Sequence, residues 1–139
     1  MTAIVLSAGT THPWNVAGIG RDIVVGADLG VRVFTAVAAV SAQDGRGVTS
    51  LHPVPVETLA SQLNALPWDA ASAVRVGALP TIGAVRTVAE FLRCRPELPA
   101  VVDPVFLASR GGDLVDMPAR FAVRDELANL ISVLLTPNL

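Results

Sequence analysis

The chain has 139 residues, of which 52% are hydrophobic and 16% are charged, and its formal net charge at pH 7 is −2. This composition suits one folded domain with a substantial core and argues against intrinsic disorder. The acidic balance argues against nucleic acid as a partner. No apolar run approaches the roughly 18 residues of a membrane span, and the N-terminus lacks the basic start of a signal peptide. The single cysteine, Cys94, suits a reducing compartment. We therefore expect a cytoplasmic single domain over residues 1–139, with no membrane attachment.

The first predicted elements are a strand and a helix. Residues 3–6 form a short apolar run, which predicts a strand, and residues 10–16 form a loop. Residues 17–29 then repeat apolar side chains every four positions, which predicts a helix with one buried face made by Ile19, Ile23 and Ala27. Gly30 follows at a position that suits the left-handed turn closing many helices.

The second predicted strand, residues 32–40, is an almost continuous apolar run, typical of a strand covered on both faces. It stops at Ser41 and leads into Ala42, Gln43 and Asp44. Ser41 and Gln43 are two residues apart, so on extended backbone they point the same way. A strand that turns polar on reaching water explains these residues. A binding site also explains them, because ligands of parallel sheets sit beyond the carboxyl ends of strands.

The rest of the chain continues the alternation of strand and helix patterns. In chain order we expect an extended segment at 48–54, a helix at 56–66, a strand at 73–76, a helix at 81–94, a strand at 100–103, a helix at 118–130 and a strand at 133–136. Such alternation implies parallel βαβ units. The sequence therefore predicts an α/β fold of three layers, with a mostly parallel sheet of about five strands and helices on both faces.

Several motifs do not meet the requirements of known sites. Gly18-Ile19-Gly20 is not a dinucleotide fingerprint, because Ile23 stands where a glycine or alanine is needed and the motif lies well after the first strand. A phosphate-binding P-loop is absent, and the sequence has no lysine to complete one. His12 and His52 both precede prolines and lack metal-ligand spacing, so we interpret them as loop histidines.

Two aspartates admit two explanations each. Asp22 lies near the start of a predicted helix, where the helix dipole favours a carboxylate by about 0.3–1 kcal/mol. The alternative is a substrate contact across the strand ends, which the sequence pattern alone favours less. Asp103 ends an apolar strand and would face the crevice beyond the sheet, although a helix cap is an alternative.

A series of short segments, in order along the chain, carries a family resemblance. They are Ala8-Gly9, Ala17-Gly18-Ile19, Asp22, Leu29-Gly30-Val31, Thr35-Ala36, Ala42-Gln43-Asp44, Gly47-Val48, His52-Pro53-Val54-Pro55, Val76-Gly77-Ala78-Leu79, Val102-Asp103-Pro104-Val105 and Thr136-Pro137-Asn138-Leu139. Together they resemble the hydroxymethylpyrimidine and phosphomethylpyrimidine kinases of thiamine biosynthesis, which are similar to pyridoxal kinases. The resemblance implies a ribokinase-like fold that is incomplete at the C-terminus, because it covers only the N-terminal, substrate-binding half of such a kinase.

The resemblance also implies roles for individual residues. Gln43 matches the residue that contacts the aminopyrimidine edge, and an amide offers the donor and acceptor that this edge requires. Asp22 matches the residue at the substrate hydroxyl. Asp103 and Asn138 fall on the side of phosphate and magnesium, whose ligands are oxygens. The rest of the substrate pocket would be lined by Gly9, Ser41, Gly77, Ala78 and Val105. ATP and Mg²⁺ are the implied cofactors.

The sequence departs from the family pattern in three places. In the first loop, the family's Gly-Ser-Asp start is replaced by Gly9-Thr10-Thr11, and its Ser-Gly-Gly-Ala-Gly run is replaced by the residues from His12 to Gly18. A methionine that is frequent in the family is replaced by Ala78. These changes leave the exact substrate open. The family's Asn-x-x-Glu motif begins at Asn138 and is cut after Leu139. We expect no catalytic residue in this chain, because the anion hole, the base and most of the ATP site lie later in the family.

Two functions follow from this resemblance, and they leave open whether the chain is an enzyme. The first is ATP-dependent phosphorylation of hydroxymethylpyrimidine or its phosphate, with this chain carrying the substrate side. The alternative is a non-catalytic pyrimidine- or pyridoxal-binding or interaction module. The expected partners are a small-molecule substrate and a second copy or second chain that completes the fold.

Overall fold

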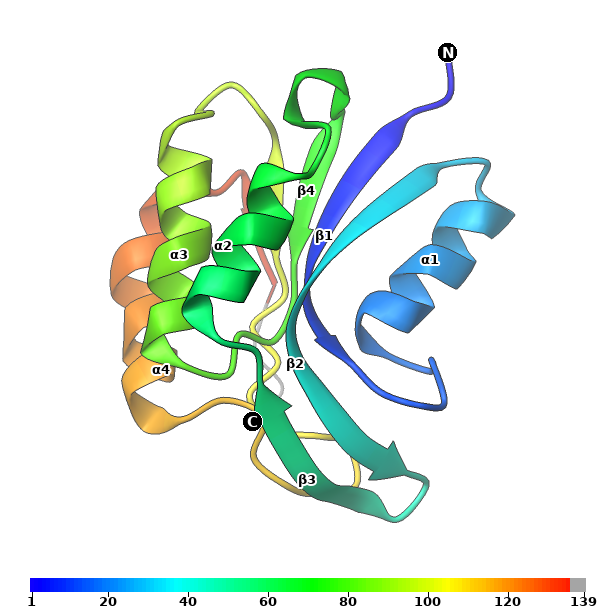
Figure 1. The fold of residues 1–139 in the computed structure, drawn as a ribbon, viewed down its shortest axis with the longest axis vertical. Helices are drawn as coiled ribbons and strands as arrows, with labels where there is room; N and C mark the ends of the chain where they lie inside the picture. The colour runs from blue at the N-terminus through cyan, green and yellow to red at the C-terminus, as the bar shows by residue number, and fades with distance from the viewer. Residues whose placement is uncertain (136–139) are drawn as a thin grey trace.

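The computed structural model describes residues 1–135, in which strands and helices alternate (Figure 1). The strands are β1 (Ile4–Thr11), β2 (Arg32–Asp44), β3 (Gly47–Pro53), β4 (Ala73–Val76), β5 (Ala100–Val102) and β6 (Val133–Leu134). The helices are α1 (Gly18–Asp28), α2 (Val56–Asn64), α3 (Ile82–Arg93) and α4 (Met117–Ala122). Short 3-10 turns at Trp68–Ala70 and Ala128–Leu130 and a π turn at Val123–Leu127 complete the elements.

The strands of the described residues form one six-stranded sheet in the order β3-β2-β1-β4-β5-β6. Every neighbouring pair is parallel except β2 and β3, which form an antiparallel hairpin. The predicted mostly parallel sheet is confirmed. It has one strand more than expected, because the extended segment predicted at 48–54 pairs with β2.

Helices cover both faces of the sheet, so the predicted three layers are confirmed. Figure 1 shows α1 on one face and α2, α3 and α4 on the other. The main core lies on the side of α2 and α3, where Leu59, Leu63, Val85 and Val88 are buried against inward side chains of the sheet. Thr81 caps α3, since its hydroxyl accepts a hydrogen bond from the Ala84 amide at 3.2 Å.

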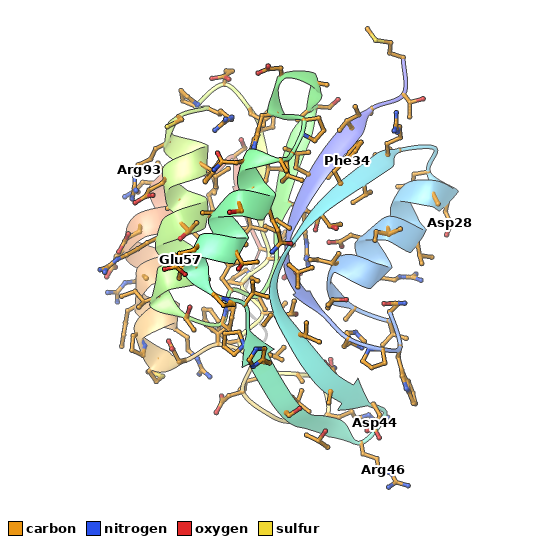
Figure 2. The ribbon with its side chains drawn as sticks, viewed as in Figure 1. Asp28, Phe34, Asp44, Arg46, Glu57 and Arg93 are labelled. Carbon is orange, nitrogen blue, oxygen red and sulfur yellow. The ribbon has the colours of Figure 1, made fainter. Side chains whose placement is uncertain are left out.

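Charged side chains stand on the outside of this arrangement. Figure 2 shows five labelled charged residues on the outer surfaces of the helices and at the tip of the β2–β3 hairpin: Asp28, Asp44, Arg46, Glu57 and Arg93. Among residues 1–135, none of the helices is both long and apolar enough to span a bilayer.

The buried face of α1 differs from the predicted one. Ile19 is buried as expected, but Ile23 is 48% exposed and Ala27 is also exposed. The helix instead faces the sheet through Ile19, Asp22 and Gly26, which are spaced three and four residues apart along one face. Gly26 permits this close packing, because a Cβ there would overlap the Val33 side chain of β2.

The predicted end of the second strand at Ser41 is wrong. β2 continues to Asp44, because β3 pairs with it from Ala39 to Asp44 and satisfies its backbone polar groups. The hairpin has a register shift between Ala42 and Gln43. The polar residues therefore belong to a strand that extends beyond the parallel part of the sheet.

The segment predicted as a helix at 118–130 is helical over that range, but only its first part is an α-helix. α4 begins after Asp116, whose side chain accepts from the Ala119 amide at 2.8 Å, and it ends at Ala122. The π and 3-10 turns follow, and nothing in the packing explains why the helix widens there. The last predicted strand, at 133–136, is observed as β6, and residue 136 lies outside the described residues.

Candidate functional site

A cavity of about 270 Å³ lies at the carboxyl ends of the parallel strands and beside the start of α1. Ligands of open α/β sheets bind at this edge. Polar and charged groups and apolar side chains line it together: Thr10, His12, Ala17, Gly18, Arg21, Asp22, Gln43, Arg75, Ala78, Asp103, Val105, Leu107, Ala108, Ser109 and Leu114. The space suits a small ligand built on a single ring.

Asp22 belongs to a polar network within this cavity. Its Oδ2 atom accepts a hydrogen bond from Ser7 Oγ at 2.5 Å and another from Arg75 Nη1 at 3.2 Å. The second guanidinium nitrogen of Arg75 donates to Asp103 Oδ2 at 2.7 Å. These charged side chains are between 23% and 29% exposed. Asp22 is therefore held by specific partners and is more than a carboxylate placed near a helix dipole.

Arg75 is a site residue that the predicted strand at 73–76 did not point to. One signal was present. An arginine in the middle of the short strand Ala73–Val76 cannot be buried without a partner carboxylate. In the structure it has two such partners, Asp22 and Asp103.

Gln43 lies on the extension of β2 beyond the parallel sheet, and its half-buried side chain lines the cavity. Within residues 1–135, its amide makes no side-chain hydrogen bond. The donor and the acceptor of the amide are thus both available to a ligand. The β2–β3 pairing, which moves the strand end to Asp44, places Gln43 on the same cavity as Asp22.

The other predicted site residues divide into two groups. Ala78, Asp103 and Val105 line the cavity together with Asp22 and Gln43. Gly9, Ser41 and Gly77 are buried and do not line it. Asn138 lies outside the described residues.

The three buried residues make contacts within and between the strands that carry the cavity. Ser41 donates to the Thr11 carbonyl at 3.4 Å, which ties β2 to β1. A Cβ on Gly9 would lie 3.5 Å from the Gly77 Cα, which is an ordinary van der Waals contact. A Cβ on Gly77 would overlap the Arg75 guanidinium.

His12 is another lining residue that no motif in the sequence pointed to. Its side chain is only 5% exposed, and neither ring nitrogen has a hydrogen-bond partner among the described residues. The sequence led us to interpret it as a loop histidine, and its burial depends on how the segment between β1 and α1 folds back over the sheet.

The described residues do not form a metal site by themselves. No group of three or more His, Cys, Asp or Glu side chains in residues 1–135 is placed to hold a metal ion. The Asp103 carboxylate accepts a hydrogen bond from Arg75 Nη2.

Sequence comparisons with known proteins match this chain to phosphomethylpyrimidine kinases. Residues 13–139 match the family model described as phosphomethylpyrimidine kinase. The hydroxymethylpyrimidine/phosphomethylpyrimidine kinase of Mycobacterium leprae is 37% identical over 137 residues, which cover 97% of this chain and 49% of that kinase.

Solved structures show the same fold. The phosphomethylpyrimidine kinase of Clostridium difficile 630 superposes with a TM-score of 0.87 at 22% identity, covering 96% of this chain and 58% of that one. The pyridoxal kinase of Staphylococcus aureus in complex with pyridoxal has a TM-score of 0.83 at 19% identity, covering 96% of this chain and 50% of that one. The chain therefore spans about half the length of these kinases.

Proposed function

This chain belongs to the phosphomethylpyrimidine kinase family, and from that premise we propose that its cavity binds a hydroxymethylpyrimidine. The chain would carry the substrate side of an ATP-dependent phosphorylation of this compound or its monophosphate, a step of thiamine biosynthesis. The whole protein's reaction is part of the proposal, because the chain spans 49% of the Mycobacterium leprae kinase.

The observation that carries the proposal is that Gln43 and Asp22 line one cavity of suitable size. The Gln43 amide can accept from the exocyclic amine of an aminopyrimidine and donate to the adjacent ring nitrogen. The Asp22 carboxylate can accept from the hydroxyl of the hydroxymethyl group. Val105, Leu107 and Ala78 supply apolar surface for the ring.

In this proposal, the cavity residues Asp22 and Gln43 act by positioning the substrate. In phosphoryl transfer, catalysis comes mostly from orientation and charge stabilisation. Asp22 would orient the attacking hydroxyl, and Gln43 would set the angle of the ring. ATP would supply the phosphoryl group. We assign no described residue to Mg²⁺, because Asp103 is already paired with Arg75.

A calorimetric titration with hydroxymethylpyrimidine tests the proposal. Gln43→Ala should weaken binding by about 1–3 kcal/mol, since the polar edge of the pyrimidine would be left unpaired. Asn64→Ala, which removes an exposed amide at the end of α2, is the matched control and should bind like the wild type. Equal affinities of the wild type and Gln43→Ala would rule out this site.

A second candidate is an interaction module that binds without transferring a phosphoryl group. Exposed apolar side chains near β6 favour it: Phe121 is 51% exposed, Val133 is 47% exposed and Leu134 is 52% exposed. A second copy or another chain would cover these residues. Sedimentation velocity at increasing concentrations tests self-association, and titration with pyridoxal tests the alternative ligand.

A further inference from the structure

We propose that Arg75 is a positioning residue, which holds the Asp22 carboxylate so that one of its oxygens meets the substrate hydroxyl. The inference rests on the proposed function. It assigns a specific task to an arginine whose charge is fully paired inside the cavity.

The order of the strands allows the Arg75 side chain to contact groups on both sides of β4. β4 lies between β1 and β5, so a side chain on β4 can approach groups above both neighbours. Asp22 projects from α1, which packs over β1 and β2, and Asp103 follows β5. The planar guanidinium presents donors on separate nitrogens and can bridge the two carboxylates, whereas a lysine ammonium is a point charge on a flexible stem.

The two oxygens of Asp22 have different surroundings. Oδ2 accepts from both Ser7 Oγ and Arg75 Nη1. Among residues 1–135, no side chain donates to Oδ1. Two donors on one oxygen fix the plane of the carboxylate and leave the second oxygen to accept from a ligand in the cavity. Without Arg75, one of the two fixing contacts disappears and the carboxylate can rotate.

Gly77 supplies a second, independent way to test the arrangement. A Cβ at this position would overlap Arg75 Nη1 and lie 3.1 Å from Cζ. The backbone of Gly77 is outside the left-handed region, so alanine introduces no backbone strain there. Gly77→Ala should therefore displace the guanidinium from Asp22 while leaving Arg75 in the chain.

The test compares two ligands that differ by one hydroxyl. Hydroxymethylpyrimidine and its analogue with a methyl group in place of the hydroxymethyl group are titrated into the wild type, Arg75→Met and Gly77→Ala. Both variants should bind hydroxymethylpyrimidine about tenfold more weakly, the equivalent of one hydrogen bond. Their affinity for the methyl analogue should stay within about twofold of the wild type, because that ligand has no hydroxyl for Asp22 to orient.

Two further variants complete the design. Arg75→Lys keeps the charge but cannot bridge both carboxylates, so it should restore only part of the affinity for hydroxymethylpyrimidine. Arg86→Met removes an arginine that pairs with Glu126 on the surface, at 2.9 Å. As the matched control, it should bind both ligands as the wild type does.

A ligand-free measurement tests the contact itself. Unfolding of Arg75→Met, Asp22→Asn and the double variant should be non-additive, because the two residues share one interaction. Additive losses would overturn the inference. An equal loss for both ligands, or no loss for hydroxymethylpyrimidine, would also overturn it while the proposed function stands. If the wild type binds neither ligand, the proposed function fails, and with it any role of Arg75 toward a hydroxyl.

Discussion

Gly18 explains at the residue scale why the Gly-Ile-Gly sequence exists without a dinucleotide site. Its φ angle is +60°, in the left-handed region, and a Cβ there would collide with the carbonyl oxygen of Thr10. Gly20 is also confined, since a Cβ there would overlap the Asn15 side chain. Both glycines thus allow the segment after β1 to fold closely against the start of α1, and the segment places His12 and Ala17 at the cavity.

Gly18→Ala should destabilise the protein by more than the conformational cost alone. A left-handed alanine costs about 1–2 kcal/mol, and here the Thr10 carbonyl must move as well. Gly30→Ala is the matched control, because Gly30 has a similar φ of +68° but no heavy atom within 4 Å of an added Cβ. Thermal unfolding compares the two. Equal shifts in Tm would show that the Thr10 contact is unimportant.

At the scale of elements, α2 completes the hydrogen bonding of β2. β3 pairs with β2 only from Ala39 onward, which leaves Val37 without a strand on that side. The Gln62 side chain of α2 takes the place of a strand there. Its Oε1 accepts from the Val37 amide at 2.8 Å, and its Nε2 donates to the Val37 carbonyl at 3.0 Å.

Gln62→Leu should lower the free energy of unfolding by about 1–3 kcal/mol, because it leaves two partly buried backbone groups unpaired. Ser61→Ala, on the exposed neighbouring residue, should stay within about 0.5 kcal/mol of the wild type. Urea unfolding measures both. A Gln62→Leu midpoint equal to that of Ser61→Ala would mean that water replaces the lost hydrogen bonds.

For the whole molecule, the strand order places β1 and β4 at the centre of the sheet and β6 at one edge. The residues Leu6, Ala8, Val74 and Val76 are buried in the main core. β6 pairs with β5 through only two residues, and Val133 and Leu134 are about half exposed. Stability should therefore fall from the centre of the sheet toward β6.

Native-state hydrogen exchange should show this gradient. Amides of β1 and β4 should exchange through global unfolding, and amides of β6 should exchange through local opening at much lower free energy. The measurement is the denaturant dependence of exchange, resolved by residue. Protection of β6 equal to that of β1 would show that the sheet opens as one unit or that another surface covers β6.

The sequence alone determined the fold class and most of the elements. The helices predicted at 56–66 and 81–94 are observed as α2 and α3, and Gly30 has the expected left-handed conformation. The polar ends of apolar runs also identified Gln43 and Asp103, which line the cavity. These features are predictable because apolar periodicity and turn chemistry are local properties of the chain.

Only the tertiary structure decided which of these residues meet. Whether β2 stops at Ser41 or continues to Asp44 depends on its pairing with β3, and the buried face of α1 depends on the fit of Gly26 against Val33. The partners of Arg75 are 53 and 28 residues away in the sequence. Such contacts follow from the strand order, which puts β4 between β1 and β5, and no local pattern in the chain encodes that order.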